Sequence, residues 1–116
     1  MRAVWILLVA AVAQGDPLDR IRGGLYRVDA EAHVVRLHPH QAWDRAQAAQ
    51  READEVVEQL QKLKLFPEAA ALHREAAELA EAARREEPED VRTHAARLEI
   101  LVRSLDDRLP AHDIAR

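Results

Sequence analysis

Residues 42–63 read AWDRAQAAQREADEVVEQLQKL, and this stretch decides the fold class. Its apolar residues recur at alternating steps of four and three, which places them on one face of an α-helix. Charged side chains occupy the opposite face, as on a helix that turns one side to solvent. The apolar positions of this first stripe are Ala42, Ala46, Ala49, Ala53, Val56, Leu60 and Leu63.

Two further helices are predicted downstream, and a proline introduces each of them. Pro67 disfavours helical geometry at Phe66 and suits the first turn of a new helix, so one helix should end and another begin there. Pro88 marks a third helix start in the same way, and Pro110 closes that helix. The second stripe comprises Ala69, Leu72, Ala76, Leu79 and Ala83, and the third comprises Val91, Ala95, Leu98, Val102, Leu105 and Leu109.

These patterns predict an all-α fold in which residues 41–110 form an antiparallel helical hairpin and a third, coiled-coil-like helix. The third stripe follows the a and d positions of a heptad repeat, so this helix could dock on the hairpin or pair with a second copy. We expect Trp43 to cap one end of the core. The predicted interaction stripe consists of Val56, Leu60, Leu63, Leu72, Leu79, Val91, Leu98, Val102, Leu105 and Leu109.

The N-terminus has the features of a cleavable signal peptide, which we assign to residues 1–13. Arg2 supplies the positive charge, residues 3–12 are apolar, and Ala11 and Ala13 are the small residues that a signal peptidase recognises. Cleavage is expected after Ala13, with Gly15 as the alternative. The apolar run is about half the length that a bilayer requires. We therefore expect an exported protein, periplasmic or extracellular, without a stable membrane span after cleavage; a retained N-terminal anchor is the alternative.

Residues 14–40 give the weakest pattern in the chain. Asp16-Pro17 and Gly23-Gly24 are breakers, and the apolar residues between them and Pro39 show no sustained period. We predict a linker of low order containing at most one short helix. Residues 111–116 are predicted to be a C-terminal tail.

The composition argues against several classes of function. A chain of 116 residues fits one domain, and its formal net charge of −4 would repel nucleic acid. It contains no cysteine, which excludes disulfides and thiol chemistry. Nucleophilic catalysis would depend on Ser104 or Thr93, both within a predicted helix, and no phosphate-binding or dinucleotide-binding glycine loop is present. We predict no enzymatic activity and no cofactor.

Histidines are the residues most suited to binding a metal ion. His38 and His40 flank Pro39 closely enough to share an ion if the loop folds around it. His73 and His94 lie on different predicted helices and could meet only if those helices pack in the right register. Solvated or partly packed histidines are the simpler interpretation, so a metal site is predicted only as an alternative, with His38 and His40 as its candidates.

Around the predicted turn, residues 53–83 resemble a single tetratricopeptide unit. Large or small apolar residues stand where that family usually has them, at Val56, Leu60, Phe66, Ala69 and Ala76. Val57, His73 and Glu81 stand in place of the family's usual glycine, aromatic residue and closing proline. The resemblance implies a helical hairpin that could bind another helix. Residues 60–85 are also similar to exported helical hairpin proteins rich in Ala, Glu, Arg and Leu, of unknown role.

Together these features predict an exported helical module for protein–protein interaction or assembly, without catalytic activity. Its partner would be another protein or a second copy of the chain that completes the core. The alternative is an envelope metal sensor or metal-buffering protein that uses its histidines.

Overall fold

The computed structural model describes residues 17–109, and this part of the chain is built from helices without a strand. Its α-helices are α2 (Pro17–Leu37), α3 (Trp43–Lys62), α4 (Phe66–Arg84) and α5 (Pro88–Arg108). A short 3₁₀ helix, η1 (Pro39–Gln41), joins α2 to α3. The predicted all-α class is confirmed. The predicted signal peptide and C-terminal tail lie outside the described residues.

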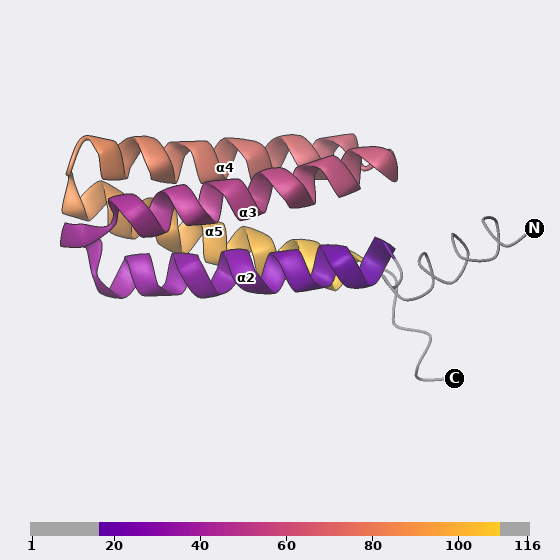
Figure 1. The fold of residues 1–116 in the computed structure, drawn as a ribbon, viewed down its shortest axis with the longest axis horizontal. Coiled ribbons are helices and arrows are strands. Elements are labelled where there is room, and N and C mark those ends of the chain that lie inside the picture. Colours follow the sequence, from indigo (N-terminus) through magenta and orange to yellow (C-terminus); the bar gives the residue numbers. More distant parts are fainter. Residues whose placement is uncertain (1–16, 110–116) are drawn as a thin grey trace, which may run out of the picture.

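The four α-helices lie side by side as a bundle (Figure 1). Helix α2 packs against α3 and α5, and α4 packs against the same two helices, so each of the four helices has two neighbouring helices. The start of α2, the α3–α4 turn and the end of α5 lie at one end of the bundle. Helix η1 and the α4–α5 turn lie at the other end.

The prediction of a low-order linker over residues 14–40 is wrong for residues 17–37, which form α2. This helix has its own apolar stripe, with steps of four and three, and every member is buried. The sequence did not predict this helix, because glycine ordinarily weakens a helix interior and the Gly23-Gly24 pair therefore indicates a break. In the bundle, Gly24 is buried where α2 approaches Val56 of α3. The stripe consists of Ile21, Leu25, Val28, Ala32 and Val35.

The turns that follow α3 and α4 have the same backbone conformation and hydrogen-bonding pattern. Lys64 and Glu86 have positive φ values of 63° and 55° in the left-handed region. The amide after each of them bonds back across the turn, from Leu65 N to Leu60 O and from Glu87 N to Ala82 O. This is the Schellman pattern, in which the left-handed residue satisfies the last carbonyls of a helix. Each turn is therefore a defined reversal that sets the start of the next helix.

Candidate binding surfaces

The predicted interaction stripe is the interior of the bundle. Nine of its ten residues are buried, and only Leu63, at 40% exposure, reaches the surface. The side chains of α2 cover the face that the sequence left open. The stripe is therefore packed within one chain, and association with a second copy stays a prediction. The buried members are Val56, Leu60, Leu72, Leu79, Val91, Leu98, Val102, Leu105 and Leu109.

A buried carboxylate joins α5 to α2. Glu99 is only 5% exposed and accepts hydrogen bonds from Arg36 Nε at 2.5 Å and from His33 Nδ1 at 3.1 Å. Burial by itself raises the pKa of Glu99, but the hydrogen bonds and positive charges of Arg36 and His33 outweigh it and leave that pKa lowered from its usual value. Glu99 therefore ties α5 to α2 through two side chains of α2.

This carboxylate makes stability depend on pH. The lowered pKa of Glu99 contributes stability that is present above the unfolded value of about 4.5 and is lost as the pH falls through the folded value. Glu99→Gln should lower the free energy of unfolding by about 1–2 kcal/mol near pH 7. The difference from wild type should shrink as the pH is lowered from 7 through the folded pKa of Glu99, because the carboxylate then becomes protonated.

Urea unfolding of both proteins across that pH range measures the effect. Glu89→Gln is the matched control, because Glu89 is an exposed acid of the same helix that pairs with Arg92 across one turn. It should change stability by less than about 0.5 kcal/mol at any pH. A Glu99→Gln deficit of equal size at acid and neutral pH would contradict the assignment.

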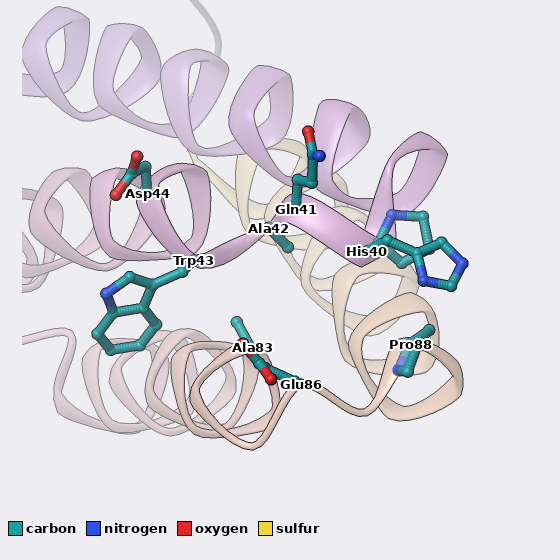
Figure 2. Close-up of a pocket in the computed structure, with 9 residues that line it drawn as sticks. His40, Gln41, Ala42, Trp43, Asp44, Ala83, Glu86 and Pro88 are labelled. Carbon is teal, nitrogen blue, oxygen red and sulfur yellow. The ribbon is translucent and has the colours of Figure 1, made fainter.

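An open notch lies at the end of the bundle formed by η1 and the α4–α5 turn (Figure 2). Its volume is about 490 Å³. Trp43 stands on one side of the opening and His40 with Pro88 on the other, while Ala83 and Glu86 lie between them. The full lining is Pro39, His40, Gln41, Ala42, Trp43, Asp44, Ala83, Glu86 and Pro88.

The indole of Trp43 gives this notch its chemical character. Trp43 is 41% exposed, so the indole borders the notch and is not a closed cap on the core as expected. Within the described part of the chain, Glu86 forms no ion pair. Next to it, a hydrogen bond with Asp90 and partial desolvation raise the pKa of Glu87 despite the nearby charge of Arg85. The notch thus combines an aromatic wall with the carboxylates of Asp44 and Glu86, an arrangement that favours a cationic group.

The histidines fall into two groups. His38 and His40 are both exposed at the end of the bundle, and neither belongs to a three-ligand group within residues 17–109. His73 does not meet His94, since its Nδ1 lies 3.6 Å from Asp54 of α3. His94 instead faces α4, where one of its ring nitrogens and one carboxylate oxygen each of Glu75 and Glu78 lie within 4.8 Å of one another.

The site residues predicted from the sequence do not include Glu99, Glu75 or Glu78. For Glu99 a signal existed, because it stands four residues after Ala95 and three before Val102, on the apolar side of α5. An acid on such a face requires a buried partner. The two α4 glutamates carried no comparable signal, since only the packing of α5 brings His94 to them.

No protein-family model, curated protein or solved structure matches this chain. Among residues 17–109, the structure contains no helix with the length and apolar character needed to cross a membrane.

Proposed function

We propose that this protein is an exported, non-catalytic helical module that binds another protein through the Trp43 notch. The observation that carries the proposal is the open notch at one end of the bundle, bordered by the half-exposed indole of Trp43. A four-helix bundle whose stripes are satisfied within the chain has no need of a partner for folding. A half-exposed indole beside an open cavity is, by contrast, typical of a surface that gains from being covered.

The notch favours a partner segment that presents an arginine or lysine with apolar neighbours. A guanidinium or ammonium group over the indole face of Trp43 gains a cation–π interaction of about 0.5–2 kcal/mol. Asp44 and Glu86, which also line the notch, supply the complementary negative charge. The occupant is therefore a basic segment of another protein, and a second copy of this chain is the competing outcome to be tested.

Export is part of the same proposal. The charged Arg2, the apolar residues 3–12 and the small residues Ala11 and Ala13 support a signal peptide. The resemblance of residues 53–83 to a tetratricopeptide unit also supports the proposal, because it implies a helical hairpin that could bind a helix of another protein. N-terminal sequencing of the envelope-fraction protein tests export: a chain beginning at residue 14 or 16 supports it, and an intact leader on cytosolic protein contradicts it.

The binding proposal is tested by comparing Trp43→Ala with Ile100→Ala. Ile100 is the matched control, because it is an apolar residue 68% exposed on α5, outside the notch lining. Both variants and wild type are used as bait for the cell-envelope fraction, and light scattering of each bait reports self-association.

A partner retained by wild type and Ile100→Ala but lost at least about tenfold with Trp43→Ala supports the notch, because ~1.4 kcal/mol of cation–π and apolar contact corresponds to a factor of ten. Equal retention by all three baits contradicts it. If wild type is a dimer and Trp43→Ala dissociates it, the occupant of the notch is a second copy of this chain and not a basic segment of another protein.

A further inference from the structure

Three half-buried side chains on α4 and α5 converge at a place that the proposed function does not use. Glu75 and Glu78 are three residues apart on α4, so they project from the same side of that helix. His94 faces them from α5, and the potential ligand atoms of the three groups lie within 4.8 Å of one another. The cluster is mixed, with one imidazole and two carboxylates contributed by two helices.

The charges of these two glutamates are not neutralised by neighbouring cations. Within residues 17–109, neither Glu75 nor Glu78 pairs with an arginine or lysine. The acids of the α2–α5 seam differ, since Asp106 and Glu99 are each held by an arginine. Two adjacent carboxylates without a cation repel each other and favour any positive charge placed between them.

His94 provides the second observation. Its Nδ1 atom is buried yet has no hydrogen-bond partner, although Glu78 Oε2 lies 3.5 Å away. A buried polar nitrogen without a partner costs free energy, so native structures almost always satisfy such an atom. A buried imidazole nitrogen without a hydrogen-bond partner, 3.5 Å from a carboxylate oxygen of Glu78, lies where a metal ion could bridge the two groups.

We propose that Glu75, Glu78 and His94 bind one divalent metal ion of the zinc type. Zinc binds imidazole nitrogen and carboxylate oxygen at about 2.0–2.2 Å in a tetrahedral arrangement, so two donors on one ion lie roughly 3.4 Å apart. The observed separation of up to 4.8 Å therefore closes with side-chain shifts of roughly 1 Å or less. The nitrogen donor favours zinc-like ions over calcium and magnesium, which prefer oxygen donors alone.

The ion would link α4 to α5 and leave a fourth coordination position open. Three protein ligands with one open position are also found in catalytic zinc sites, where the fourth ligand is water. Here the open position could equally accept a donor from a bound partner. The direct consequence for this chain is that metal binding stabilises the packed form, because the ligands of two helices meet only in the folded bundle.

Calorimetric titration of the purified protein with zinc chloride tests the proposal. One ion per chain should bind, and the midpoint of thermal unfolding should rise with zinc concentration. Glu75→Gln/Glu78→Gln should weaken binding by at least about 100-fold, since loss of an outer-shell partner alone costs about 10–100-fold. His94→Gln should weaken it to a similar extent. Both variants keep the side-chain size, and thermal unfolding without zinc verifies that they fold.

Two controls separate this site from the other histidines. His73→Ala changes an exposed histidine of α4, and His38→Ala/His40→Ala removes the pair that the sequence favoured. Neither should alter zinc affinity. The proposal is overturned if wild type binds no zinc, if the double glutamine variant keeps its affinity, or if only the His38/His40 variant loses it.

Discussion

Leu98→Ala should lower the free energy of unfolding by about 3–5 kcal/mol without changing the oligomeric state of the protein. Leu98 is fully buried, with 0% of its surface exposed, and belongs to the common core of the four helices. Truncation removes its transfer free energy and leaves a cavity that packed neighbours fill only in part. Urea denaturation measures the loss, and light scattering measures the mass of the native species.

Ile100→Ala is the control two residues further along α5. Ile100 is exposed, so its truncation should change the free energy of unfolding by no more than about 0.5 kcal/mol. The pair distinguishes two roles for the coiled-coil-like pattern of α5. If Leu98→Ala instead dissociated an oligomer and left monomer stability unchanged, the stripe would be an interface and the closed bundle would be wrong.

The sequence predicted helical segments well where apolar residues recur without glycine. Helices α3, α4 and α5 begin and end close to the expected prolines, because Pro67 and Pro88 each restrict the backbone in a way that needs no tertiary context. Helix α2 was missed although Leu25 and Val28 belong to a regular stripe. In the sequence, the glycine pair suggests a helix breaker. In the fold, Gly24 instead allows α2 to approach Val56 of α3 closely, and this contact cannot be read from the sequence of α2 alone.

The candidate sites were much less accessible to sequence reasoning. The Trp43 notch joins η1 with a turn more than forty residues later, so it exists only when the bundle closes. The metal-ligand group depends on the register between α4 and α5, which places His94 rather than His73 beside the two glutamates. Residue type suggested histidines as candidates, but it could not say which carboxylates they would meet.

Gly24→Ala should destabilise the protein, whereas Gly23→Ala should stabilise it. A Cβ atom added at Gly24 would overlap Cγ2 of Val56. A β-branched side chain in a helix has one strongly preferred rotamer, so Val56 cannot turn away without cost and α2 must move off α3. Such overpacking costs about 1–3 kcal/mol. It should outweigh the gain of up to about 1 kcal/mol in helix propensity that alanine brings at either position.

Gly23 is the matched control because it differs only in what surrounds it. An added Cβ there would lie 3.6 Å from Arg27 Nη1, an ordinary van der Waals distance. Thermal and urea unfolding should therefore give free energies of unfolding that differ by about 1–3 kcal/mol between the two variants, or roughly 4–24 °C in Tm for a domain of this size. If both variants are stabilised equally, α2 does not approach α3 closely at Gly24.

A second substitution identifies the cause of the Gly24→Ala effect. Val56→Ala removes the methyl group that the new Cβ would meet, so adding Gly24→Ala on this background should cost little or even stabilise. The two changes should therefore be non-additive, with a coupling of about 1–2 kcal/mol in a double-mutant cycle. Additive effects would mean that Gly24 is needed for another reason. A measured coupling would show that α2 packs directly against α3. This packing helps α2 to cover the three predicted stripes, which then form one buried core.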